Sequence, residues 1–247
     1  MHGWRARIGL IIPSANFTME PEFYKMIPEG VTVHTSRMLL TETTSDTLVE
    51  MERHGVRAAE ELKTAGVDLL IFGCTSGSFL EGVDHDIEIM RKLKDATGIP
   101  AITTSTAVLE ALRLCQIRRV SVASPYVDEI NKKLHVFLEA NGFEVIQIKG
   151  LGLGERKRIF PISDLPISTI GMQSPYVSYR LVRKIISDDA DGYFISCTNF
   201  RTIEIIQMLE DDLSKPVITS NQASLAIALK QMGIHNKVRG FGSLFER

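Results

Sequence analysis

Two short apolar segments, one in each half of the chain, end in Cys-Thr. The first, residues 69–75, reads LLIFGCT, and the second, residues 192–198, reads GYFISCT. A continuous apolar run bounded by polar residues is typical of a strand that is buried on both faces of a parallel sheet. The chain is therefore expected to place Cys74 and Cys197 at the carboxyl ends of two buried strands. Their matching context predicts that the two thiols face each other.

The order of the other predicted elements also repeats. Four strands are predicted in each half, over residues 7–13, 31–36, 69–72 and 100–105, then 119–125, 144–148, 193–196 and 216–221. Helical periodicity lies between them, for example over residues 48–65. Such alternation is the signature of βαβ units, whose right-handed crossovers make parallel sheets. We expect an α/β fold of two pseudo-symmetric lobes, each a short parallel four-stranded sheet flanked by helices.

The repeat predicts three parts of the chain. Residues 1–109 form the N-terminal lobe, residues 110–222 form the C-terminal lobe, and residues 223–247 form a helix and tail that pack back on the N-terminal lobe. The helix after the fourth strand of each lobe is expected to cross onto the other lobe. These crossings would tie the two halves together around a cleft.

Extra length in the second half lies mainly between residues 149 and 175. Equivalent positions are 112 residues apart at the first strands (Pro13 and Pro125) and 123 apart at the two cysteines. The inserted segment carries several Gly and Pro residues, which favour turns and loops. We predict that it forms a loop covering the site.

Polar residues follow the strands at the edge where ligands bind in parallel α/β sheets, beyond the strands' carboxyl ends. These strand ends are Pro13–Asn16, Cys74–Ser76, Ser124–Tyr126, Cys197–Asn199 and Thr219–Asn221. All of them are expected to line one cleft between the lobes.

The residues beside each cysteine suggest chemistry. A thiol at a strand end with a helix starting directly behind it meets backbone N–H groups and the positive end of a helix dipole, and both favour the thiolate. Donors at the same places can hold a carboxylate or a developing enolate without a metal. In the first lobe these donors are Thr75 and Ser76, and in the second they are Thr198 and Asn199. A buried packing role is the simpler explanation of a single cysteine, but it does not explain the duplication.

The composition limits the other classes of function. With 28 basic and 30 acidic residues and a formal charge of −2, the chain has no electrostatic reason to bind nucleic acid or an anionic membrane. Three cysteines without a Cys-x-x-Cys motif predict neither a disulfide scaffold nor a zinc site, and Cys115 is expected in the core. Without an 18-residue apolar run or a signal peptide, a cytoplasmic protein that does not enter the membrane is expected. The Gly150–Gly154 stretch lacks the spacing and context of a dinucleotide loop, so no such cofactor is predicted.

Three basic residues are weaker candidates for contact with a substrate carboxylate. His34 and Arg37 end the second strand, and Arg201 comes four residues after Cys197. Packing of the histidine and ion pairs of the arginines, such as Arg201 with Glu204, explain them equally well.

The paired lobes with Cys-Thr at both strand ends resemble the aspartate/glutamate racemase superfamily over nearly the whole chain. Within it, Ile8–Glu22 resembles the maleate cis–trans isomerase and arylmalonate decarboxylase branch, through Pro-Ser-x-Asn followed by Met-Glu-x-Glu. Ser124-Pro125-Tyr126 resembles the same branch. The resemblance implies chemistry without cofactor or metal on a small mono- or dicarboxylate. It also implies a homodimer or a higher homo-oligomer as the assembly.

For the maleate isomerase reaction, the resemblance implies that Cys74 adds to an alkene carbon and that Cys197 is the acid and base on the other face. It implies substrate contacts from the strand ends, namely Ser14, Asn16, Thr75, Ser76, Tyr126, Thr198 and Asn199.

Other reactions remain open. In a racemase of the aspartate, glutamate or hydantoin type, the two thiols exchange a proton at one carbon. In an arylmalonate decarboxylase only the second-lobe cysteine is needed, and the first-lobe position is usually glycine, so Cys74 counts against it. A small-carboxylate binding protein would also have two lobes around a cleft, but it has no need for two thiols at equivalent strand ends.

Overall fold

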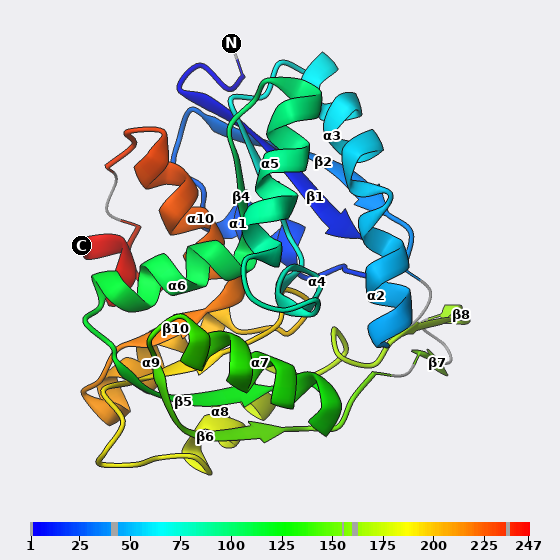
Figure 1. Cartoon of the computed structure of the whole chain (residues 1–247). Coiled ribbons are helices and arrows are strands. Elements are labelled where there is room, and N and C mark those ends of the chain that lie inside the picture. Colours follow the sequence, from blue (N-terminus) through cyan, green and yellow to red (C-terminus); the bar gives the residue numbers. More distant parts are fainter. Residues whose placement is uncertain (1, 41–43, 155, 160–162, 236–237) are drawn as a thin grey trace.

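The chain folds around two parallel sheets of four strands (Figure 1). The computed structural model describes residues 2–40, 44–154, 156–159, 163–235 and 238–247. The first sheet has the order β2-β1-β3-β4, with β1 (Ala6–Pro13), β2 (Val31–Met38), β3 (Leu69–Phe72) and β4 (Ala101–Thr103). The second has the order β10-β9-β5-β6, with β5 (Arg119–Ser124), β6 (Glu144–Gly150), β9 (Gly192–Ile195) and β10 (Val217–Thr219). The predicted α/β class with two parallel four-stranded sheets is confirmed.

Helices flank both sheets. Those before β5 are α1 (Met19–Met26), α2 (Ser45–Glu52), α3 (Gly55–Thr64), α4 (Thr75–Phe79), α5 (His85–Thr97) and α6 (Thr104–Leu114). Those after it are α7 (Asp128–Ala140), α8 (Pro175–Arg183), η1 (Ile203–Ile205), α9 (Ile206–Leu213), α10 (Ser220–Gln231) and η2 (Ser243–Glu246). The single helix predicted over residues 48–65 is wrong, because α2 and α3 are separate and Gly55, a poor residue for a helix interior, begins α3. Among the described residues, none of the helices is long and apolar enough to span a membrane.

The central strands explain why the two cysteines share an environment. Every residue of β3 and of β9 is buried, as expected for apolar strands covered on both faces of a parallel sheet. Each is paired with the first strand of its own lobe, with Leu10 opposite Ile71 in the first sheet and Val122 opposite Phe194 in the second. Both cysteines therefore lie just beyond the carboxyl edge of a sheet centre.

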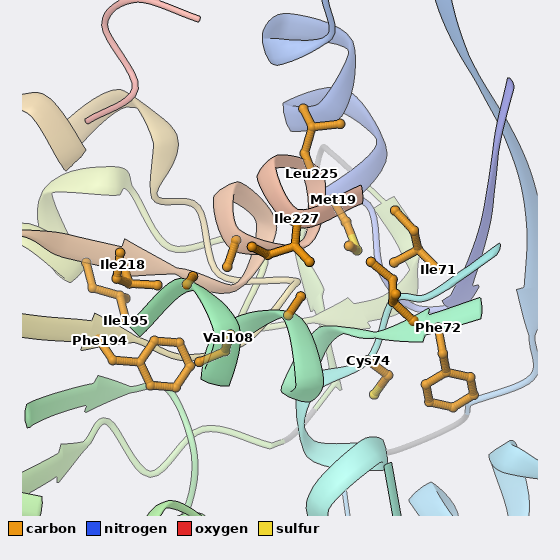
Figure 2. Close-up of a cluster of buried hydrophobic side chains, with 14 of the residues drawn as sticks. Met19, Ile71, Phe72, Cys74, Val108, Phe194, Ile195, Ile218, Leu225 and Ile227 are labelled. Atoms are coloured by element: carbon orange, nitrogen blue, oxygen red, sulfur yellow. The ribbon is translucent and has the colours of Figure 1, made fainter. Parts of the chain in front are cut away.

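Two helices join the lobes into one core. Helix α6, which follows β4 of the first sheet, packs on α10 and contacts β10, while α10, which follows β10, contacts α1 and β3. Apolar side chains of these helices and of strands from both sheets form one buried cluster (Figure 2). Its members include Val108 from α6, Leu225 and Ile227 from α10, Ile71 and Phe72 from β3, Phe194 and Ile195 from β9, and Ile218 from β10. The carboxyl ends of the two sheets are thereby held against each other.

The inserted segment contains a short hairpin in place of the predicted loop. Strands β7 (Arg156–Ile159) and β8 (Ser163–Ser168) pair antiparallel, and the hairpin projects from the body of the molecule (Figure 1). Pro166 lies within β8, and proline is tolerated in a strand only at an edge or a bulge. The several Gly and Pro residues of the segment predicted a loop, and Pro166 lies in a strand nonetheless. Residues 155 and 160–162 of the insertion lie outside the described residues.

Candidate active site

A pocket lies where the carboxyl ends of the two sheets meet. It is lined by Pro13, Ala15, Asn16, Leu40, Leu48, Cys74, Thr75, Ser76, Tyr126, Ser168, Ile170, Cys197, Thr198 and Asn199. Eight of the nine residues predicted for the site are in this lining. The ninth, Ser14, is not, and its hydroxyl instead accepts a hydrogen bond from the Leu40 N–H (2.9 Å).

Cys74 is the N-cap of the short helix α4. Its backbone is extended (φ −141°), and its Sγ accepts a hydrogen bond from the Gly77 N–H (3.4 Å) and lies 3.9 Å from the Ser76 hydroxyl. These contacts favour the thiolate, as the sequence predicted. However, burial raises the pKa of the Cys74 thiol from 9.0 to about 11, because removing a thiolate from water costs more than the two donors return. The prediction that the surroundings of Cys74 favour the thiolate is therefore wrong for the net effect on its pKa.

Cys197 lies in a different backbone environment. Residues 198–200 form a turn and a bend, residues 201 and 202 are irregular, and the next helical turn is η1, so the helix expected directly behind this cysteine is absent from the described residues. Its φ is +104°, a strained value for a residue other than glycine, of a kind that concentrates at functional sites. Burial raises the pKa of the Cys197 thiol to about 12, although the Asn199 and Phe200 N–H groups and the Tyr126 hydroxyl lower it.

Tyr126 places a hydroxyl beside the thiols. The Ser196 hydroxyl donates to the Tyr126 hydroxyl (3.4 Å), and the ring packs edge-on against Phe79 of α4, with centroids 6.5 Å apart. Asn131 holds the turn by accepting from Ser124 (2.5 Å) and donating to the Tyr126 carbonyl (3.2 Å). Burial, and then the neighbouring Cys197, raises the pKa of Tyr126 well above 10.0. The phenol therefore stays protonated and can donate a hydrogen bond into the pocket.

Hydrogen bonds connect the two cysteine loops directly. The Thr198 hydroxyl donates to the carbonyl of Gly73 (3.1 Å), and Gly73 is the residue before Cys74. In return, the Ser220 hydroxyl accepts from Thr75 (2.9 Å) and from the Cys197 N–H (3.0 Å). Ser220 does not line the pocket and was absent from the predicted site residues, although its place directly after β10 gave a signal. Each cysteine loop is thus anchored partly by the other lobe.

Both asparagines of the pocket accept hydrogen bonds from backbone N–H groups. Asn16 caps α1 by accepting from the Thr18 and Met19 N–H groups (2.9 and 3.0 Å), and it donates to the Thr198 hydroxyl (2.9 Å). Asn199 accepts from the Phe17 N–H (3.1 Å). An amide nitrogen carries two hydrogens, so both side chains can still donate toward a ligand carboxylate.

The three weaker candidates lie outside the pocket lining. Arg37 donates to the Asn16 carbonyl (2.6 Å) and pairs with Glu20 (2.8 Å), so it supports the loop after β1. His34 lies 3.1 Å from the Thr32 hydroxyl, and Arg201 pairs with Glu204 (3.6 Å). The interpretation of these residues as packing and ion pairs accounts for all three.

Among the described residues, one group has the geometry of metal ligands. Ligand atoms of Glu52, Glu81 and His85 lie within 4.8 Å of one another. The Lys92 ammonium is 3.2 Å from Glu52, and His85 is 2.8 Å from the other oxygen of the same carboxylate. These contacts make the group an ion-pair cluster, and none of its members lines the pocket.

Comparisons with known proteins show which family the chain belongs to. The family model described as arylmalonate decarboxylase matches residues 8–245. The chain belongs to the arylmalonate decarboxylase family. It is 27% identical to maleate isomerase from Pseudomonas putida, over 96% of each chain, and 26% identical to arylmalonate decarboxylase from Bordetella bronchiseptica, over 97% of this chain and 96% of that one. The predicted resemblance to this branch is confirmed, and the chain is an enzyme.

Two solved structures of family members show the same fold. The maleate isomerase Iso of Pseudomonas putida S16, in a mutant form with maleate, has a TM-score of 0.88 at 24% identity and covers 97% of both chains. A mutant Nocardia farcinica maleate cis–trans isomerase with a covalently bound succinylcysteine intermediate has a TM-score of 0.87 at 19% identity, over 97% of this chain and 98% of that one. At these identities the likeness shows the architecture of this arylmalonate decarboxylase family member and no more.

Proposed function

We propose that this enzyme isomerises a small unsaturated dicarboxylate of the maleate type by reversible covalent addition, without a cofactor. The observation that carries the proposal is that Cys74 and Cys197, from equivalent strand ends, line the same pocket with the Tyr126 hydroxyl beside them. Addition to a double bond uses a nucleophile and a separate proton donor. A malonate decarboxylation needs only a donor for the enediolate that remains when CO₂ leaves.

In the proposed first step, the Cys74 thiolate forms a bond to one alkene carbon. The π electrons move toward the carboxylate on the other carbon and give an enediolate, and the former double bond becomes a single bond that can rotate. The Cys197 thiol then gives its proton to the enediolate carbon and becomes a thiolate. The product of this half-reaction is a succinyl thioether on Cys74.

The reverse sequence after rotation gives the trans diacid. The Cys197 thiolate removes the proton from the carbon that it protonated, the double bond forms again, and the bond from carbon to Cys74 Sγ breaks. Both thiols return to their starting states, so atoms and electrons balance without any co-reactant.

The raised pKa values set the cost of this chemistry. With a pKa of about 11 for Cys74, about one molecule in 10⁴ carries the thiolate at pH 7, a cost of about 5 kcal/mol. A thiolate of high pKa is the more reactive nucleophile, which partly offsets its scarcity. Turnover is therefore expected to rise with pH.

Polar groups around the thiols are proposed to hold the substrate. Thr198 also lines the pocket, but its hydroxyl gives its single hydrogen to the Gly73 carbonyl and supports the loop. The hydroxyls of Tyr126 and Ser76 and the amides of Asn16 and Asn199 belong to residues that line the pocket. As buried donors, they act on developing enediolate charge more strongly than they would in water. Thr75 is expected to act through its hydrogen bond to Ser220.

One observation favours decarboxylation of a malonate as a second candidate. Part of the pocket is aliphatic, lined by Leu40, Leu48 and Ile170, and this wall suits an apolar substituent better than a second carboxylate. In that reaction Cys197 alone would protonate the enediolate, and Cys74 would have no covalent role.

Proton NMR in D₂O separates the candidates. With maleate, the proposal predicts loss of its vinyl signal and growth of the fumarate signal, and Cys115→Ser, which changes a buried thiol outside the pocket lining, should behave like the wild type. Loss of CO₂ from an arylmalonate, with maleate unchanged, would support the decarboxylase instead. Deuterium entering the α-carbon of an amino acid or hydantoin would support a racemase.

A further inference from the structure

The loop that carries Cys197 needs support from outside itself. Cys197 has a positive φ, and no helix directly follows it to fix the described residues 198–202. Strained backbone persists only where its surroundings determine it. The contacts that hold this loop therefore bear on where the Cys197 thiol points.

Glu22, on α1 of the first lobe, is buried against the end of this loop. One carboxylate oxygen accepts from the Thr202 N–H (2.9 Å) and lies 3.5 Å from the Ile203 nitrogen, which also donates to it. The side chain is only 3% exposed. A carboxylate from one lobe thus satisfies backbone donors of the other.

Asn221 connects the same carboxylate to the residue after Cys197. Its Nδ2 donates to the second oxygen of Glu22 (2.6 Å) and to the Thr198 carbonyl (3.0 Å). Its Oδ1 has no hydrogen-bond partner among the described residues, and a flipped amide would lose both Nδ2 bonds and place its oxygen against the Glu22 carboxylate. Glu22 therefore fixes the orientation in which Asn221 holds Thr198.

We propose that Glu22, through Asn221 and the Thr202 N–H, is a positioning residue that holds the strained Cys197 loop in its reactive geometry while ionised. All its neighbours named above are donors, so protonation of either oxygen weakens one of these contacts. Glu22 does not line the pocket, so it acts on the reaction only through this loop.

The charge of Glu22 is set by its surroundings. Its pKa is raised from 4.5 to about 7: burial is the largest cause and Glu204 of η1 also raises the pKa, while Asn221 and the two backbone N–H groups lower it. Glu204 is itself paired with Lys25 of α1 (3.1 Å) and Arg201 (3.6 Å). The side chain that α10 directs at Glu22 is the neutral Asn221. Glu22 is thus poised to change charge near neutral pH.

The kinetic test compares wild type with Glu22→Gln from pH 5.5 to 8.5, and it rests on the proposed isomerase function. The glutamine keeps the shape but turns a donor toward Asn221. At pH 8.5 we expect a loss of about 10- to 100-fold in kcat/KM, the scale of a misplaced catalytic group. At pH 5.5 wild type should approach the variant. The ionisation of the substrate cancels in the ratio of the two enzymes.

Thermal unfolding should change with pH in the opposite sense. A raised carboxyl pKa means that the folded state binds the proton more tightly than the unfolded chain, so the stabilisation is present at pH 4.5 and is lost as pH rises to about 7. The Tm of wild type relative to Glu22→Gln should therefore fall between pH 5 and 8, while its relative activity rises. A merely structural role would move both in the same direction.

Glu210→Gln is the matched control. Glu210 also accepts backbone N–H bonds, from Val217 (3.0 Å) and Ser243 (2.7 Å), but it does not touch the Cys197 loop. We expect its variant to keep wild-type kcat/KM across the pH range. An equal loss in both variants, or a ratio of wild type to Glu22→Gln that does not change with pH, would overturn the proposal.

Thiol labelling tests the positioning role of Glu22 without the substrate. Iodoacetamide labelling at pH 8.5, read by peptide mass spectrometry, should be several-fold faster at Cys197 in Glu22→Gln than in wild type and unchanged at Cys74. Equal labelling of Cys197 in both proteins would refute the positioning role. If wild type fails to isomerise maleate while the labelling difference is seen, the proposed function fails and the role of Glu22 stands.

Discussion

The two cysteine loops begin alike and are held in different ways. Cys74 has an extended backbone and caps a helix of its own lobe, where the Gly77 N–H points at its sulfur. Cys197 has a positive φ and is followed by turns, and its loop is held largely by the other lobe, through Gly73, Asn16 and Glu22. The two cysteines thus occupy equivalent positions in the two lobes, but different contacts hold their loops.

This difference suggests a division of roles. A nucleophile that forms and breaks a bond to carbon benefits from a rigid local frame, which α4 supplies to Cys74. In the proposed mechanism the acid and base acts on the other face of the substrate, and Cys197 would do so from a loop whose geometry depends on contact between the lobes. Substitutions in the two loops should therefore differ in their effects on activity and stability.

The largest expected effect is the loss of the proposed nucleophile. Cys74→Ser should abolish measurable isomerisation, since a serine hydroxyl is a far weaker nucleophile than a thiolate at neutral pH. Cys197→Ser should lose about 10²- to 10⁴-fold, the usual contribution of general acid–base catalysis. Steady-state rates with maleate measure both, and equal losses would indicate two-base proton exchange at one carbon.

The second effect is a steep dependence on alkaline pH. Because the pKa of Cys74 is raised to about 11, its thiolate fraction grows about tenfold per pH unit, so kcat/KM should rise about 100-fold from pH 7 to pH 9. Initial rates over this range, with the fold checked by circular dichroism, measure the rise. A plateau beginning near pH 8 would mean that the thiol ionises far more readily than its burial implies.

Thr198→Val should weaken the support of the Cys197 loop. It removes a buried hydroxyl that accepts from Asn16 and donates to Gly73, and each unsatisfied group costs about 1–3 kcal/mol. We expect lower stability in urea and a loss of about tenfold in kcat. Thr97→Val is the control: its buried hydroxyl bonds Leu93 and Ile99 away from the pocket, so it should lose stability but keep kcat.

The smallest effect should come from Gly77→Ala, on the Cys74 side. A Cβ there would lie 3.1 Å from Cys74 Sγ, so the sulfur must shift by a few tenths of an ångström. The loss in kcat/KM should stay below the roughly 10²-fold that a 1 Å misplacement can cause. The Tm should not fall with it, since alanine is favoured over glycine inside a helix by about 1 kcal/mol. A lower Tm with unchanged activity would contradict this view of the Cys74 loop.

The sequence predicted the strands and the pocket well because both follow from local patterns. Apolar runs such as residues 69–72 mark buried strands, and the polar residues after them meet because parallel strands end at one edge. Eight predicted residues line the pocket for this reason.

Long-range effects could not be predicted in this way. The pKa of each thiol depends on how completely the other lobe buries it, and no local motif reports that. Glu22 meets Asn221 and the Thr202 N–H from positions 199 and 180 residues away in the chain. The hairpin β7–β8 was missed because the several Gly and Pro residues of the segment predict a loop, and its two strands pair with each other in a separate sheet.

The most direct test of the central claim is to trap the bond to Cys74. In Cys197→Ala, mixed with maleate and quenched in acid, the enediolate takes its proton from water in place of the Cys197 thiol, and no thiolate is then present to remove it, so the succinyl thioether should accumulate. Peptide mass spectrometry is expected to find a succinyl group on the peptide that carries Cys74, and none when Cys74 is also changed to Ser. Turnover of maleate by wild type with no adduct on Cys74 would contradict covalent addition.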